Sequence, residues 1–200
     1  MEVNVTYSTQ DIWTWWFAVY LYTGGLGAAT LAVTFLTDMY LKPHRNLVLW
    51  GAGSGVVLLS VGSLMLFSHL LDHLSAIHVL NPLAMFNQPS AWIAWGTQFI
   101  LWMMVWGILY AIPYARVTPL FQNMPLVGKA LEWNFVVKLS EFIERYRKAV
   151  GWLAVVNGVG IAVYTGLVLQ SFPAVALWAN PGVPLLFTVS AFSTAMAFLL

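Results

Sequence analysis

The sequence predicts an all-α integral membrane protein, a multi-helix transmembrane bundle with five spans. The first observation is composition, because the chain is 60% hydrophobic and only 8% charged, whereas a soluble domain carries about 25% charged residues. The second is a series of five apolar stretches close to or above the roughly 20 residues that cross a bilayer as a helix. These stretches lack the period-two alternation of membrane β-strands. Helices in a bilayer are therefore favoured over a soluble domain.

The third observation is the placement of the basic residues. Lysine and arginine occur only between the first and second stretches and between the third and fourth, and the other connections carry none. Since Lys/Arg bias in short loops sets orientation in a membrane, we expect the N-terminus outside and the basic loops in the cytoplasm. Nothing indicates a basic nucleic-acid surface. The basic residues are Lys42, Arg45, Arg116, Lys129, Lys138, Arg145, Arg147 and Lys148.

The five expected spans cover residues 12–37, 47–71, 91–113, 149–172 and 182–200. Tryptophans cluster at several of their starts, as in the aromatic belts that anchor helices at membrane interfaces. The last span runs to the end of the chain without a polar or basic stop, so we expect the sequence to be the front part of a longer protein. The belt tryptophans are Trp13, Trp15, Trp16, Trp92, Trp95 and Trp178.

The connections differ in length and charge. The first, 38–46, is short and begins at Asp38. The third, 114–148, is long, and its apolar residues recur at helical spacing opposite charged ones. This pattern predicts an amphipathic helix over about 126–148 on the cytoplasmic face. Its apolar residues are Leu131, Phe135, Leu139, Phe142 and Tyr146.

Three glycine clusters lie inside the spans. A phosphate-binding loop would need a preceding strand or a following Lys-Ser/Thr pair, and none of the clusters has either. Small residues instead let membrane helices approach closely, so the clusters indicate helix packing. They are Gly24-Gly25-Leu26-Gly27, Gly51-x-Gly53-x-Gly55 and Gly158-x-Gly160.

A polar cluster, His69, Asp72 and His73, ends the second span. An ionisable group at such a depth is costly, which makes Asp72 a functional hypothesis. His69 and His73 share one helix face and cannot ligate a haem iron from opposite sides, and the other spans contain no histidine. A metal site on the three residues and a merely interfacial polar cap both stay open. The absence of cysteine excludes a Cys-ligated zinc or iron–sulfur site in this chain.

Polar side chains also occur inside the apolar spans. In lipid they need hydrogen-bonding partners, and singly each is explained by a structural bond between helices. With the N-terminus outside, however, Tyr20, Tyr164, His69 and Asp72 all fall toward the outer half of the membrane. This convergence on three helices predicts a site there. The polar residues of the spans are Tyr20, Tyr22, Asn157, Tyr164 and Gln170.

Six sequence blocks, spread in order over nearly the whole chain, are similar to those of a known protein family. They are residues 15–29 (WWFAVYLYTGGLGAA), 70–72, 88–92, 164–167 (YTGL), 178–181 (WANP) and 184–194. In these blocks the sequence resembles the NrfD/PsrC family, the polysulfide reductase membrane subunits. The resemblance implies two four-helix bundles. Residues 1–172 would then form the first bundle, and residues 173–200 a loop and the first span of a second, incomplete one.

The resemblance also implies a function. Such proteins are quinone/quinol-binding subunits of respiratory oxidoreductases in the prokaryotic inner membrane, without haem or metal of their own. They pass electrons between menaquinone, or another quinone, and an iron–sulfur partner subunit attached to a molybdopterin-type catalytic subunit. A transporter or channel, and a purely structural anchor, are the alternatives.

Site residues follow from the resemblance by position. It implies that Tyr20 and Tyr164 bind the quinone head group, and that Asp72 and His69 exchange protons. Phe17 departs from the pattern, because some members have a polar residue there that can hydrogen-bond. A phenol positions a carbonyl, whereas a carboxylate or imidazole exchanges protons near neutral pH.

Overall fold

The computed structural model describes residues 15–42, 44–69, 80–87, 89, 91–171, 177–178 and 180–200, and the regular elements within them are all helices. Among these described residues, five helices are long and apolar enough to cross a membrane. The predicted all-α membrane fold is therefore confirmed. The long helices are α1 (Trp15–Leu41), α2 (Arg45–His69), α5 (Trp92–Val117), α9 (Arg147–Gln170) and α10 (Gly182–Leu199). The short helices are α4 (Ala84–Asn87), α6 (Pro119–Gln122), α7 (Pro125–Leu131) and α8 (Asn134–Arg145).

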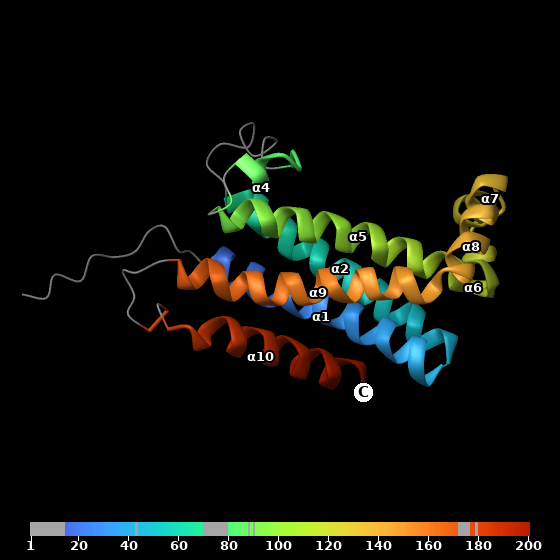
Figure 1. The fold of residues 1–200 in the computed structure, drawn as a ribbon. Coiled ribbons are helices and arrows are strands. Elements are labelled where there is room, and N and C mark those ends of the chain that lie inside the picture. The colour runs from blue at the N-terminus through green and yellow to red at the C-terminus, as the bar shows by residue number, and fades with distance from the viewer. Residues whose placement is uncertain are drawn as a thin grey trace, which may run out of the picture.

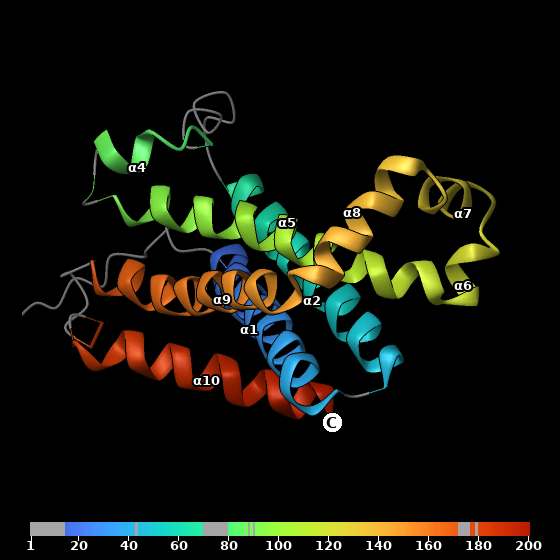
Figure 2. The same cartoon turned by 45° about the vertical axis from the view of Figure 1, so that its right-hand side comes forward.

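The long helices run alongside one another, with α6, α7 and α8 gathered at one end of the bundle and α4 at the other (Figures 1 and 2). Helix α1 is the most buried of the five and packs against α2, α9 and α10. Because α1 and α5 end, and α2 and α9 begin, beside α6–α8, all eight basic residues lie at this end. We call it the basic end, and the other the α4 end.

Close backbone approach between helices depends on glycine. A Cβ added at Gly27 of α1 would lie 2.7 Å from a backbone nitrogen of α2, and one at Gly55 of α2 would lie 3.1 Å from a backbone oxygen of α1. A Cβ at Gly158 of α9 would lie 3.0 Å from another backbone oxygen of α1. The packing role predicted for the glycine clusters is confirmed at these three positions. Gly53 is an exception, because a Cβ there would meet no atom within 4 Å.

The helix bounds differ from the predicted spans. The first span was expected to end at residue 37, but α1 continues to Leu41 and includes Asp38. The third was expected to end at Pro113, but α5 continues to Val117. A charged residue is costly inside a membrane span and a proline often breaks a helix, but the carboxylate of Asp38 has the partners described below. A proline inside a membrane helix is tolerated because neighbouring groups satisfy the freed carbonyl. Residues 12–14 lie outside the described part of the chain.

The predicted single amphipathic helix over 126–148 is wrong, because the segment forms α7 and α8 with a break at Trp133. The extended backbone of Trp133, at φ −61° and ψ 131°, starts α8 in a new direction. Helix α8 buries Ile143 beside α5 and leaves Phe135 and Phe142 70% and 56% exposed. The helical spacing of the apolar residues correctly predicted helix on both sides of Trp133. The change of direction at Trp133 does not alter that spacing, so the sequence pattern could not reveal it.

Candidate functional site

Tyr20 of α1 and Tyr164 of α9 meet inside the bundle. Their hydroxyl oxygens lie 2.8 Å apart, the distance of an O–H···O hydrogen bond. The two side chains are only 1% and 3% exposed. Tyr20 lies near the start of α1 and Tyr164 near the end of α9, so the pair sits toward the α4 end, away from the basic residues.

The neighbouring helices determine where the two rings lie. The Tyr164 ring packs directly over Gly96 of α5, where any Cβ would overlap the ring. The Tyr20 ring lies between Phe17, with ring centroids 5.7 Å apart, and Gly24, where a Cβ would lie 3.5 Å from the ring. These residues share one face of α1, because positions three and four apart are neighbours on a helix. The predicted residues Tyr20 and Tyr164 are therefore brought together by α1, α5 and α9.

The paired hydroxyls have a defined hydrogen-bonding capacity. Each phenol carries one O–H donor and can also accept. When one donates to the other, the accepting hydroxyl keeps its own proton, which can be donated to a third group. The low dielectric of the protein interior strengthens such a bond. The pair can therefore present one phenolic donor to a carbonyl oxygen.

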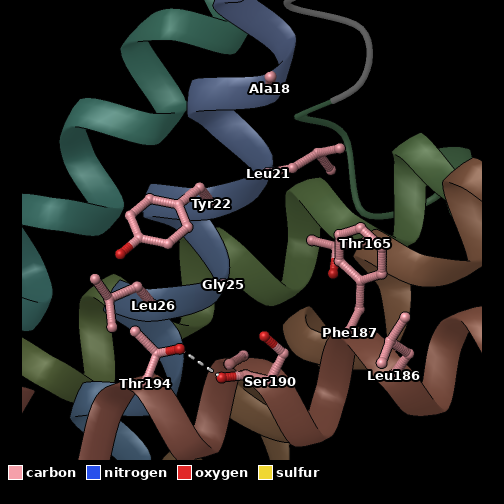
Figure 3. A pocket seen from close by; sticks show the side chains of 11 residues that line it. Ala18, Leu21, Tyr22, Gly25, Leu26, Thr165, Leu186, Phe187, Ser190 and Thr194 are labelled. Carbon is pink, nitrogen blue, oxygen red and sulfur yellow. Dashed lines mark hydrogen bonds between the residues drawn. The ribbon is translucent and has the colours of Figure 1, made fainter. Parts of the chain in front are cut away.

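A cavity of about 460 Å³ lies between α1, α9 and α10, and neither Tyr20 nor Tyr164 is among the residues that line it. Leu21 and Thr165, the chain neighbours of the two tyrosines, line it, and α10 contributes Phe187 and Thr194 (Figure 3). Its volume lies in the range of small-molecule sites. The Thr194 hydroxyl donates to the carbonyl of Ser190 on its own helix, so this wall presents mainly apolar surface to an occupant.

A second polar cluster, which the sequence analysis missed, lies at the basic end. Oδ2 of Asp38 accepts hydrogen bonds from the hydroxyls of Tyr110 at 2.6 Å and Tyr114 at 2.7 Å. It also pairs with Nε of Arg147 at 3.0 Å. Nη2 of Arg147 donates to the Asp38 carbonyl at 3.1 Å. The Asp38 side chain is 3% exposed and that of Arg147 34%. The cluster therefore joins α1, α5 and α9 through one buried carboxylate.

The sequence analysis placed Asp38 in the first loop, and this was wrong, because Asp38 lies inside α1. A signal for it exists in the sequence, because Thr30, Thr34 and Asp38 follow one another at four-residue spacing and so share a face of α1. Tyr110 and Tyr114 show the same spacing on α5. A polar stripe on each of two apolar helices would have placed Asp38 inside the first one, though not beside its partners.

The comparisons with known proteins agree with this architecture. The sequence matches the family described as "Polysulphide reductase, NrfD" over residues 3–200. The chain belongs to the NrfD family. It is 26% identical over 208 aligned residues to the "Protein NrfD homolog" of Haemophilus influenzae, a match that covers 98% of this chain and 61% of the relative. The NrfD-family chain thus spans about three fifths of the length of the curated relative that it matches. No solved structure matches it.

Of the remaining predicted site residues, His69 is the one that falls within the described part of this NrfD-family chain. His69 is the last residue of α2, at the α4 end of the bundle, where the tyrosine pair also lies. Asp72 and His73 lie outside the described residues, so their approach to the pair, and the alternative metal site on these three residues, stay predictions. Elsewhere in the described part of the chain, no three His, Asp or Glu are placed to hold a metal ion.

Two other polar residues predicted in the spans have ordinary surroundings in this NrfD-family protein. The Asn157 side chain donates to the carbonyl of Leu153 at 2.7 Å, within its own helix. Tyr22 is 61% exposed on α1 and lines the cavity. The tyrosine pair is therefore the part of the predicted outer site that the described residues bring into contact.

Proposed function

We propose that this chain is a quinone- or quinol-binding membrane subunit of a respiratory oxidoreductase complex. Electrons pass between a menaquinone-type quinone and an iron–sulfur partner subunit, itself attached to a molybdopterin-type catalytic subunit. The observation that carries the proposal is the buried Tyr20–Tyr164 pair, which offers a phenolic donor inside the bundle. Membership of a family described as polysulphide reductase supports it.

The residues of the pair bind and orient a head group. Interconversion of quinone and quinol moves two electrons and two protons, which is the chemistry the bound molecule supplies. The free O–H of the Tyr20–Tyr164 pair donates to one carbonyl oxygen, and the hydrogen bond between the phenols holds that donor in place. Phe17 packs against the Tyr20 ring, and the Tyr164 ring packs against Gly96. Both tyrosines are almost fully buried, so little water reaches their hydroxyls. Binding is therefore directional even though no side chain of the pair is charged.

Protons must be exchanged with water while electrons leave through the partner. We assign this exchange to Asp72 and His69, since a carboxylate or imidazole can accept and release protons near neutral pH. Because α2 ends at the α4 end of the bundle, His69 lies at the same end as the tyrosine pair. In an Asp72→Asn variant we expect slower quinol turnover with unchanged quinone affinity. Unchanged turnover and proton release would exclude the role of Asp72.

The location and orientation of the protein are part of the proposal. We place it in a prokaryotic cell membrane with its N-terminus outside. The support is that all eight basic residues lie at one end of the bundle, the end expected to stay in the cytoplasm. The tyrosine pair then lies toward the outer surface, where the iron–sulfur partner would dock.

The test uses the complex with its native partner subunits. Tyr20→Phe and Tyr164→Phe each remove one hydroxyl while keeping the ring, and Tyr40→Phe is the control because Tyr40 is 64% exposed on the same helix. Loss of one buried hydrogen bond costs about 0.5–1.5 kcal/mol, so we expect kcat/KM for quinol to fall roughly two- to tenfold in either variant. The control should match the wild type.

Two results would contradict the proposal. Unchanged quinol turnover in both tyrosine variants would favour a structural anchor. Solute flux through the reconstituted chain without a redox partner, together with no quinone binding, would favour a transporter or channel.

A further inference from the structure

An open groove lies at the basic end, between the first turns of α2 and the corner where α5 meets α6. Its volume is about 670 Å³. We call it the α2–α6 groove and define it by Arg45, Asn46, Trp50, Val57, Thr118 and Leu120, which line it. Figure 2 shows the start of α2 and the short helix α6 at this end of the bundle. The groove is remote from the tyrosine pair, which lies toward the α4 end.

The groove changes from polar to apolar along α2. Arg45 and Asn46 line it at the basic end of α2, which we call its mouth, and Trp50 and Val57 line it further along the helix. The distance from Arg45 to Val57 along a helix is about 18 Å at 1.5 Å per residue. Half of a hydrocarbon core is about 15 Å. The groove therefore matches the length and polarity of a lipid in a single leaflet.

Arg45 supplies a binding group for an anion at the mouth. Its Nη1 donates to the carbonyl of Val117 at 3.1 Å, and this bond fixes the guanidinium against α5 while most of its donors stay available. Within the described residues that line the groove, no carboxylate neutralises it. A guanidinium with free donors recognises phosphate by paired hydrogen bonds. Lys42 and Arg116 at the same end add to the positive potential.

Apart from Arg45, Asn46, Ser54 and Thr118, the lining of the groove is apolar, and much of it is exposed. Trp50 and Leu120 are 75% and 58% exposed. Ser54 donates to the carbonyl of Gly51 on its own helix, so it requires no polar partner from an occupant. Gly53 leaves free space, because a Cβ there would meet no atom within 4 Å. The groove thus has room for an acyl chain beneath its charged mouth.

We propose that the α2–α6 groove binds an anionic phospholipid. The headgroup phosphate lies on Arg45, and an acyl chain runs along α2 past Trp50 toward Val57. Charge complementarity at the mouth and the one-leaflet length of the groove select this occupant over a neutral ligand or a peptide. The proposal does not depend on quinone binding at the tyrosine pair.

The first test compares two variants that lose the same charge. The full chain, in its complex, is placed in nanodiscs of phosphatidylcholine with increasing phosphatidylglycerol, and bound lipid is counted by native mass spectrometry. One basic group near a membrane surface contributes enough to change affinity about fivefold. We expect Arg45→Gln to weaken phosphatidylglycerol binding about fivefold and Lys129→Gln, on α7, to have little effect. Equal losses in both would reduce the effect to overall charge and overturn the proposal.

The second test fills the groove without damaging the fold. Gly53→Leu places a side chain in the open space and removes a glycine from a helix interior, so we expect a higher Tm together with less bound phosphatidylglycerol. Ala197→Leu, at an exposed position on α10, is the control for added bulk. Undiminished phosphatidylglycerol on Gly53→Leu, or a preference of the wild type for phosphatidylcholine, would overturn the proposal.

Discussion

Removing the carboxylate of Asp38 should destabilise the whole bundle, because this group joins three helices. In Asp38→Ala, Tyr110 loses the acceptor that lies 2.6 Å from its hydroxyl while only 1% exposed. An unsatisfied buried donor of this kind costs about 1–3 kcal/mol. Tyr114 is half-buried, so water can replace part of its bond. Arg147 is 34% exposed, and the pair with it contributes only about 0–1 kcal/mol.

Together these losses predict that Asp38→Ala lowers the free energy of unfolding by about 1–4 kcal/mol. Asp38→Asn is the matched variant. Its amide oxygen can still accept from both phenols, so only the charge is lost, and we expect about 1 kcal/mol or less. The assay is reversible unfolding of the full chain in mixed micelles, followed by circular dichroism while the denaturing detergent is increased. A loss below about 1 kcal/mol in Asp38→Ala, or equal losses in the two variants, would refute the role given to the hydrogen bonds.

Three further predictions concern packing, the tyrosine pair and orientation. Gly27→Val should destabilise the bundle by about 1–3 kcal/mol through overpacking against α2, whereas Gly53→Ala should stabilise it by about 0.5–1 kcal/mol; similar effects at both sites in the same unfolding assay would contradict the packing argument. Tyr20→Phe should cost about 0.5–1.5 kcal/mol, and an unchanged midpoint would mean that the 2.8 Å hydroxyl contact does not stabilise the fold. Because the chain has no cysteine, single-cysteine variants at Lys138 and Asn87 should be labelled by an impermeant thiol reagent from opposite sides of the membrane; labelling of both from one side would refute the topology.

Much of the architecture follows from local apolar patterns. Each long helix coincides with one expected span, because about 20 apolar residues in a bilayer have to form a helix that satisfies its own backbone. The ends of the helices were harder to predict. Asp38 and Pro113 both interrupt an apolar stretch, and their effect depends on groups that come from other helices.

In the candidate site, too, the residues could be predicted from the sequence but their contacts could not. Tyr20 and Tyr164 could be selected from the sequence as polar residues in apolar spans, and through their resemblance to a family pattern. Their hydroxyl contact depends on how α1 and α9 are rotated about their axes. Gly96 contributes to that rotation, since it leaves space for the Tyr164 ring. Neither the apolar pattern nor the family blocks indicate this contact.

The sequence by itself determined the class of protein, the number of spans and the end of the bundle at which basic residues gather. Each of these properties depends only on the hydrophobicity and charge of single segments, so it can be obtained by considering one segment after another. Only the tertiary structure decided which polar groups meet: the tyrosine pair, the carboxylate of Asp38 with Arg147, and the open groove beside Arg45. The physical reason is that a buried polar group is stabilised by partners from distant segments, and the packing of helices in three dimensions selects those partners.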